Sequence, residues 1–283
     1  MSKIKDIFME TYRRWSDYDG ITDSAALAFI FLLSLPALIL FTLSLGSMFL
    51  QQKALQHRII AYVSTIASQT TVDTLNDLFG QLPTTGTTTL GLIISSLLLL
   101  WTATNLFRQL QKTINGMWNV EYHHETWYED IIKKRLASVV AVFAFVLIIV
   151  LTTAFEFALL EISRRLNSLF PLSVNIIQYT SLILNFFILF MIFIYLYRVL
   201  PETRLDMKYV LTGSFMTALL ITIGKYVFSL YLSISDPTSV YGSIGSMIAI
   251  FLWIYYSAII VTIMIQFTKV YADIDRGVAV EKK

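Results

Sequence analysis

The segment from Asp236 to Lys269 constrains the fold most, because 32 uncharged residues lie between its two charged ends. A helix needs about 20 mostly apolar residues to cross the hydrocarbon core of a bilayer. Aromatic residues near both ends of the segment suit the two membrane–water interfaces. The segment therefore predicts a membrane-spanning helix.

The composition of the whole chain points to the same environment. Hydrophobic residues make up 56% of the 283 residues and charged residues 14%, and the mean hydropathy is +0.68. Soluble domains carry about 25% charged residues, and a soluble fold of this size could not hide so much apolar surface. We therefore expect a polytopic membrane protein. The chain has no cysteine, which excludes disulfides and thiolate metal sites, and we expect no metal or other cofactor.

Uncharged apolar runs of about 18 or more residues divide the chain into predicted spans. The prediction is an all-α, polytopic membrane protein with a single membrane domain over residues 1–283, six transmembrane helices and short amphipathic interfacial helices. The predicted spans cover about 24–50, 87–107, 136–160, 174–197, 209–234 and 242–267. Two of the short amphipathic helices are expected in the connection 51–86.

Lysine and arginine are distributed unevenly between the two ends of these spans. The N-terminal arm, two connections and the C-terminal tail carry sixteen of the 21 basic residues on one side, and the other side carries four. Cytoplasmic loops of membrane proteins carry an excess of Lys and Arg. Both termini are therefore expected in the cytoplasm.

The N-terminal arm has apolar residues near helical spacing, with Lys and Arg between them: Ile4, Ile7, Phe8, Trp15 and Tyr18. Such a pattern is typical of a helix lying on the cytoplasmic leaflet. A cytoplasmic helix packed on the membrane helices would show the same pattern. Both interpretations stay open from the sequence.

Several short motifs follow one another along the chain, each occurring once. They are Ser24-Ala25-Ala26-Leu27-Ala28-Phe29, Leu100-Trp101-Thr102-Ala103, Asn115-Gly116-Met117-Trp118-Asn119-Val120, Tyr197-Arg198-Val199-Leu200-Pro201, and Tyr241-Gly242-Ser243-Ile244-Gly245 followed by Trp253-Ile254-Tyr255. In order and spacing the chain resembles the YihY/BrkB family of bacterial inner-membrane proteins, formerly named ribonuclease BN. The resemblance covers about residues 21–273. It implies a six-helix bundle in the cytoplasmic (inner) membrane and supplies no defined activity.

The chain departs from the family pattern at the end of the sixth span. Relatives often carry a Gly-Ala-Glu-like triplet there, where this chain reads Met264-Ile265-Gln266. Gln266 cannot titrate, so a proton-coupling carboxylate is not expected at this position.

Two ionisable residues, Glu156 and Lys225, lie inside predicted spans. A charge at mid-membrane costs about 2.5–3.5 kcal/mol on insertion scales, so such residues are candidates for function. One hypothesis is that the two side chains pair or line a cavity that opens to the outside. The alternative is that Lys225 extends to the outer headgroups while Glu156 lies near the interface.

Uncharged residues inside the spans give further candidates for a substrate pathway: Asn185, Gln266 and, near the middle of the sixth span, Trp253. Hydrogen bonds between helices are the more common explanation for such polar residues, and core packing is the more common one for Trp253, with a substrate-pathway role as the alternative. Pro36 is expected to kink the first span. Glycines in the last two spans are expected to allow close helix packing, with a hinge role left open: Gly213, Gly224, Gly242 and Gly245.

The function that we expect from these features is transport of a solute, an ion or a lipid, with membrane lipids as partners. A non-transporting scaffold or envelope-assembly factor is the alternative, and homo-oligomerisation stays open. We expect no enzyme activity and no nucleic acid partner. The three histidines, His57, His123 and His124, lack the spacing with carboxylates that a hydrolytic metal centre needs.

Overall fold

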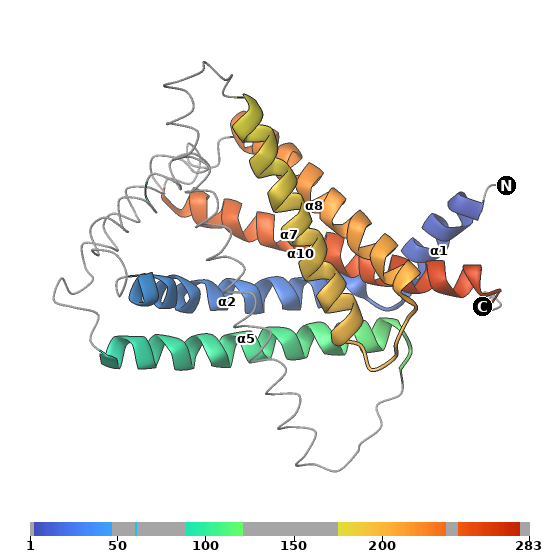
Figure 1. The fold of residues 1–283 in the computed structure, drawn as a ribbon, viewed down its shortest axis with the longest axis horizontal. Helices are drawn as coiled ribbons and strands as arrows, with labels where there is room; N and C mark the ends of the chain where they lie inside the picture. Colours follow the sequence, from blue (N-terminus) through green and yellow to red (C-terminus); the bar gives the residue numbers. More distant parts are fainter. Residues whose placement is uncertain (1–2, 47–59, 61–88, 121–174, 236–242, 278–283) are drawn as a thin grey trace, which may run out of the picture. The chain divides into compact units, whose positions relative to one another are not determined.

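The computed structural model describes residues 3–46, 60, 89–120, 175–235 and 243–277. All regular secondary structure in these ranges is helical, which confirms the all-α prediction there (Figure 1). The third predicted span and the connection 51–86, apart from residue 60, lie outside the described residues. The six helices are α1 (Lys3–Asp17), α2 (Gly20–Gly46), α5 (Thr89–Met117), α7 (Asn175–Val199), α8 (Met207–Ser235) and α10 (Ser243–Asp275).

Helices α2, α5, α7, α8 and α10 overlap the first, second, fourth, fifth and sixth predicted spans. Among the described residues, four helical segments are long and apolar enough to cross a membrane: Gly20–Ala37, Leu182–Val199, Met207–Leu232 and Ile248–Asp275. A helix that is apolar on all sides is typical of a membrane span. The chain is therefore a multi-pass membrane protein, while the count of six spans stays a prediction.

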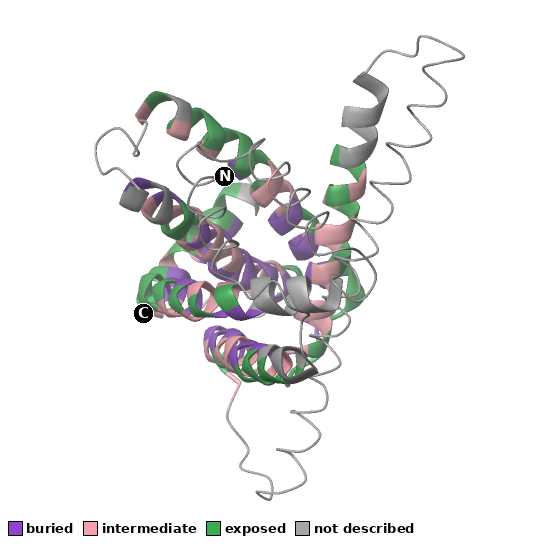
Figure 2. Cartoon of the chain, turned by 90° about the vertical axis from the view of Figure 1, so that its left-hand side faces the viewer, coloured by how far each residue is buried: buried purple, intermediate pink, exposed green. Residues whose placement is uncertain are grey.

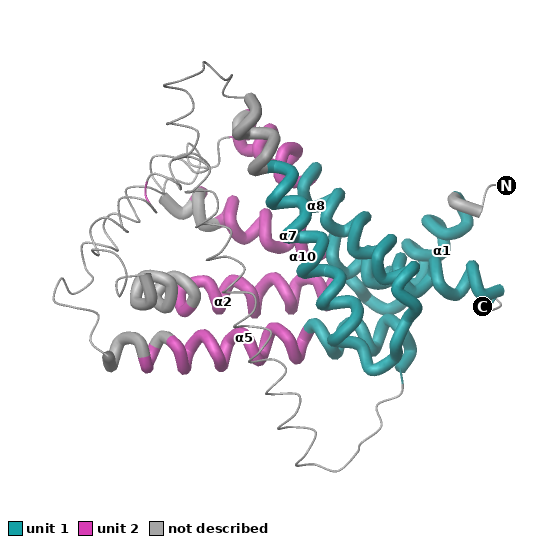
Figure 3. Tube along the Cα trace, in the orientation of Figure 1, with its two compact units in different colours: residues 1–20, 110–223, 260–283 teal, residues 21–109, 224–259 magenta. Residues whose placement is uncertain are grey.

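The described residues form two compact units (Figure 3). The first comprises residues 1–20, 110–223 and 260–283, and the second comprises residues 21–109 and 224–259. Helices α5, α8 and α10 contribute residues to both. The first unit contains α1 and the C-terminal part of α10, and it holds the polar residues discussed below.

Helix α1 is joined to α2 by a tight turn. Asp19 has a φ of 62°, in the left-handed region that Asp and Asn tolerate better than most other side chains. Gly20 follows, and the indole of Trp15 lies so close that a Cβ on Gly20 would overlap it. The missing side chain at Gly20 thus lets Trp15 fold back against the turn.

One face of α1 is buried against α10. Ile7, Thr11 and Trp15, spaced by four residues, are 8%, 2% and 5% exposed. Ile7 joins an apolar cluster with residues of α10: Ile260, Met264, Phe267 and Val270. Figure 2 shows the buried residues concentrated where the helices meet. The N-terminal arm is therefore packed on α10, while its placement relative to the cytoplasmic leaflet stays a prediction.

In the second unit, aromatic rings join α8 to α10. The ring of Trp253 lies 5.2 Å from that of Phe228 and 6.1 Å from that of Tyr256, measured between centroids. A Cβ placed on Gly224 would lie 2.7 Å from the ring of Tyr256. The two helices therefore pack closely at Gly224, with Trp253 in their contact.

Candidate functional site

A face of α10 in the first unit is polar although the helix as a whole is apolar. Thr262, Gln266, Lys269 and Asp273 follow one another at intervals of four, three and four residues, which places them on one side of a helix. Thr262, Gln266 and Asp273 are 0%, 2% and 8% exposed. We call these four residues the polar face of α10.

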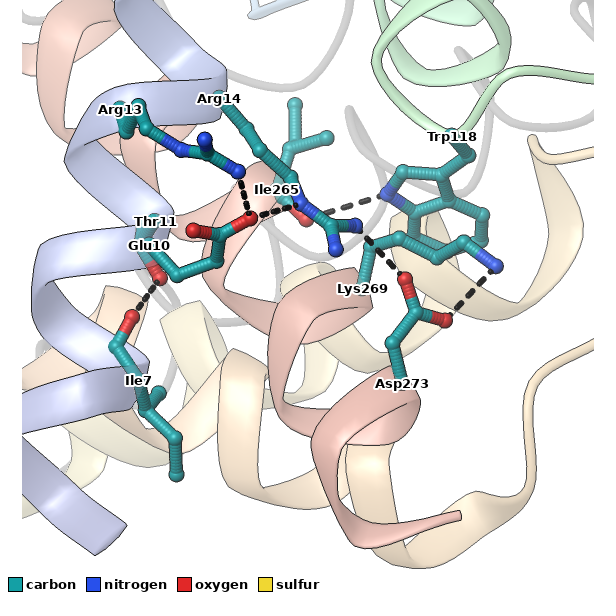
Figure 4. Close-up of polar contacts among 9 residues, drawn as sticks. All are labelled: Ile7, Glu10, Thr11, Arg13, Arg14, Trp118, Ile265, Lys269 and Asp273. Atoms are coloured by element: carbon teal, nitrogen blue, oxygen red, sulfur yellow. Dashed lines mark hydrogen bonds and ion pairs between the residues drawn. The ribbon is translucent and has the colours of Figure 1, made fainter. Parts of the chain in front are cut away.

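Helix α1 contacts the polar face at both ends. Near one end, the indole N–H of Trp15 donates to Thr262 Oγ1 over 3.0 Å. At the other end, Arg14 Nη1 donates to Asp273 Oδ2 over 2.8 Å (Figure 4). Lys269 Nζ lies 3.1 Å from the second oxygen of the same carboxylate. Gln266 lies between these two contacts along α10.

The contact with Asp273 is part of a longer ion-pair network. Glu10 Oε1 accepts hydrogen bonds from Arg13 Nη2 over 2.7 Å and from Arg14 Nε over 2.8 Å (Figure 4). Burial alone would raise the pKa of the Glu10 carboxyl, but the hydrogen bonds from Arg13 and Arg14 outweigh it and hold that pKa below its usual range. The network contains three cations and two carboxylates, so this end of the site carries excess positive charge.

The residue that follows α5, Trp118, contacts α10 beside Gln266. The indole N–H of Trp118 donates to the backbone oxygen of Ile265 over 3.1 Å (Figure 4). Asn115 is 1% exposed, and its Oδ1 accepts from the backbone N–H of Glu202 over 3.1 Å. The end of α5 is therefore held both by α10 and by the segment that follows α7.

Helix α8 packs closely on α10 in the same unit. A Cβ on Gly213 would overlap the hydroxyl of Thr268, so the two backbones approach more closely than a side chain would allow. One turn later in α8, Thr217 Oγ1 lies 2.9 Å from the Tyr197 hydroxyl of α7, and both residues are buried. Helices α7, α8 and α10 are thus joined by small and hydroxyl-bearing residues, which is typical of contacts between membrane helices.

Within the first unit, four buried side-chain atoms of α5, α8 and α10 have no hydrogen-bond partner among the described residues. They are Thr113 Oγ1 and Asn115 Nδ2 of α5, Ser214 Oγ of α8 and Gln266 Oε1 of α10. A buried polar atom without a partner costs about 1–3 kcal/mol, and buried polar groups in proteins are normally satisfied by protein or by water. The four atoms therefore suit water or a polar ligand.

The structure places the predicted pathway residues in different surroundings. Gln266 is buried on the polar face, whereas Asn185 is exposed on α7 and Lys225 is exposed on α8. Trp253 packs between aromatic rings in the second unit. Glu156 lies outside the described residues, so its pairing with Lys225 stays a prediction.

The residues predicted to shape the helices are also found in different settings. Pro36 lies inside α2, which is helical from Gly20 to Gly46, and the predicted kink stays a prediction. Gly245 is buried in the first turn of α10, and Gly242 lies outside the described residues. Gly213 and Gly224 face Thr268 and Tyr256 respectively, while a hinge role for any of these glycines stays a prediction.

Sequence reasoning missed most of the polar face and its partners. Thr262 and Ser214 are ordinary hydroxyl residues in apolar runs, and Thr113 follows Lys112 in the polar last part of α5, so nothing in their identity distinguishes them. The signal that could have found the face is the spacing of Thr262, Gln266, Lys269 and Asp273, which repeats at helical period. The pairing of Arg14 with Asp273 joins residues 259 positions apart and left no sequence signal.

Comparison with known proteins identifies relatives over nearly the whole chain. The family model described as "Virulence factor BrkB" matches residues 11–280. "Putative ribonuclease-like protein YfkH" of Bacillus subtilis is 26% identical over 270 residues, which are 92% of each chain. A "UPF0761 membrane protein" of Pseudoalteromonas atlantica is 24% identical over 267 residues, covering 94% of this chain and 86% of the relative. No solved structure matches.

Proposed function

The chain belongs to the virulence factor BrkB family of membrane proteins, and we propose that it is a transporter that moves a polar solute, an ion or a lipid headgroup across the bacterial cytoplasmic membrane. The observation that carries the proposal is the set of four buried polar atoms in the first unit, on α5, α8 and α10, that have no partner among the described residues. A passage for a polar substrate needs such atoms. Packed helices with no passage do not.

Energetics favour transport over the alternative of a scaffold. The four atoms lie at or near the cytoplasmic ends of the predicted spans, with Thr113 and Asn115 beyond the span 87–107, but each is buried away from bulk water. Four unsatisfied atoms at about 1–3 kcal/mol each would be a large cost for a protein whose helices only pack together. Water or substrate at Thr113, Asn115, Ser214 and Gln266 removes that cost. A scaffold or envelope-assembly factor would function equally well with Ala or Leu at these positions.

The proposal includes a single membrane domain with six spans and both termini in the cytoplasm. The sixteen basic residues on one side and four on the other support this orientation. In it, the sixth span leaves the membrane toward the cytoplasm near residue 267, so Lys269 and Asp273 lie at the cytoplasmic end of the polar face. The passage then opens to the cytoplasm beside α1.

The proposal assigns no catalysis to the chain. The ribonuclease-like name of the Bacillus relative is not extended to it, because His57, His123 and His124 lack carboxylates at the spacing of a hydrolytic metal centre. Membrane lipids are the proposed partners, with no nucleic acid, and homo-oligomerisation is left open. Lys225 and Glu156 stay proposed substrate-pathway residues.

Reconstitution into liposomes tests the proposal, with a panel of ions, solutes and labelled lipids. Gln266→Leu should lower the flux of the transported species by about tenfold, the equivalent of one lost hydrogen bond to the substrate. Ile265→Leu, at the fully buried neighbouring position, is the matched control and should retain flux. Lys225→Ala is tested beside them.

A scaffold gives a different result in the same experiment. The folded wild-type protein would then show no flux of any kind. In addition, Gln266→Leu would raise the melting temperature, because it removes an unsatisfied polar group from a dry contact.

A further inference from the structure

We propose that α1 lies in the phospholipid headgroup layer of the membrane and that one of its faces inserts there. That face consists of Lys5, Phe8, Met9 and Tyr12, and we call it the outer face of α1. Its occupant is the bilayer surface itself, with Lys5 meeting the phosphates of the headgroups. The inference does not depend on whether the protein transports anything.

The residues of α1 separate into two faces by their spacing. Ile7, Thr11 and Trp15 follow at intervals of four residues and are buried in the first unit. Lys5, Phe8, Met9 and Tyr12 follow at positions i, i+3, i+4 and i+7, which also share one side of a helix. The helix therefore has a second apolar face besides the one that packs on α10, and Phe8 lies at the border between them, with its ring 5.7 Å from that of Phe267 in α10.

The outer face exposes large apolar side chains. Phe8, Met9 and Tyr12 are 55%, 56% and 65% exposed, and Lys5 is also exposed. Two aromatic rings beside a lysine are typical of the membrane–water interface, where rings sit among the headgroups and the lysine reaches the phosphates. An apolar face of this kind is unfavourable in water and favourable at a bilayer surface.

The contacts of α1 with α10 hold it at the depth of the headgroup layer. Ile7 packs in a cluster that reaches from Ile260 to Val270 of α10, and the predicted sixth span ends near residue 267. Arg14 pairs with Asp273, six residues beyond that end. Helix α1 is thus held where α10 leaves the hydrocarbon core, and this is the depth of the headgroup layer.

The bilayer fits the outer face better than a second copy of the chain does. Four side chains of one helix provide much less than the roughly 800 Å² per partner that a standard protein interface buries. A two-fold interface built on this face would also bring a lysine from each chain to the same patch. At a bilayer surface both features are favourable, since headgroup phosphates accept the lysine.

Site-specific labelling tests the proposal, because the chain has no native cysteine. Single cysteines at Phe8, Met9 and Tyr12 carry an environment-sensitive nitrobenzoxadiazole label in the full-length protein, reconstituted in liposomes. Asp6→Cys and Asp17→Cys, which replace exposed residues outside the outer face, are the matched controls. The expected result is blue-shifted emission at positions 8, 9 and 12, quenched by brominated lipids, with neither effect at positions 6 and 17.

Further measurements distinguish the bilayer from other occupants. With Lys5→Glu the quenching at Tyr12→Cys should fall most in vesicles that contain anionic lipid. Labels at positions 8, 9 and 12 that are as water-exposed as those at 6 and 17 would overturn the proposal. So would efficient disulfide cross-linking between two Tyr12→Cys chains at high lipid dilution, because it would show that a second copy covers the face.

Discussion

Trp118, the residue that follows α5, donates its indole N–H to the backbone oxygen of Ile265 in α10 over 3.1 Å. In a regular helix that oxygen already accepts the N–H four residues later, so the indole adds a second hydrogen bond. The contact joins the two helices at the residue next to Gln266. It therefore sets the spacing between α5, which carries Asn115, and the polar face of α10.

Trp118→Phe should lower the stability of the protein in detergent by about 1 kcal/mol, because it removes this hydrogen bond while keeping an aromatic ring. Thermal unfolding measures the change. Trp101→Phe is the matched control in α5, since Trp101 is 65% exposed and its replacement should leave the melting temperature nearly unchanged. Equal effects of the two substitutions would contradict the assigned role of Trp118.

Gly213→Ala should destabilise the protein by about 1–3 kcal/mol, the usual cost of overpacking, because the new methyl group would overlap Thr268. This loss outweighs the gain of at most about 1 kcal/mol that Ala brings to a helix. Adding Thr268→Ala should recover part of it, measured as a double-mutant cycle. A neutral or stabilising Gly213→Ala would show that α8 and α10 are further apart than described.

Arg14→Ala should cost about 2 kcal/mol of stability, because it leaves the carboxylates of Glu10 and Asp273 without a shared charged donor. Their side chains are 11% and 12% exposed, respectively. Lys208→Ala is the comparison, because the ion pair of Lys208 with Asp275 involves a lysine side chain that is 61% exposed. Exposed pairs contribute about 0–1 kcal/mol. If Lys208→Ala lowered the stability as much as Arg14→Ala, the larger stabilisation assigned to the ion pairs of Arg14 would be contradicted.

The pH dependence of stability should reflect Glu10. The pKa of the Glu10 carboxyl in the folded protein lies below its usual value of 4.5. The ionised carboxyl therefore stabilises the fold at pH values above 4.5, and this stabilisation is lost as the pH falls through the lowered pKa. Glu10→Gln should therefore be less stable than wild type at about pH 7, with the difference shrinking toward about pH 3. Melting curves across this range measure it. A constant difference would contradict the proposed ion pairs of Glu10.

The sequence could predict the helices because apolar length is a local property. Predicted spans such as 174–197 and 209–234 agree closely with α7 (Asn175–Val199) and α8 (Met207–Ser235). Helix α10 continues to Asp275, beyond the apolar run, where Asp273 pairs both with Lys269 of the same helix and with Arg14 of α1. Hydrophobicity alone cannot indicate such an extension.

The site was less accessible from the sequence, because it depends on which polar residues face one another. Gln266 was found as a polar residue in an apolar span. Ser214 and Thr113 could not be found in this way, because hydroxyl residues in helices usually bond to their own backbone. Thr217 and Thr268 do so here. The packing of helices decides which hydroxyl stays unpartnered, and that information is not local.

The central claim is that the polar interior near α10 is reached by water from the cytoplasm, and cysteine labelling tests it most directly. Single cysteines at Thr113, Asn115, Ser214 and Gln266 are treated with a small, charged thiol reagent at the cytoplasmic face of inverted vesicles. Ile114→Cys and Ile265→Cys, at fully buried neighbouring positions, are the controls. The account predicts that the four polar positions react several times faster than the two controls. Reaction at all six positions at the same slow rate would contradict it and indicate a dry scaffold.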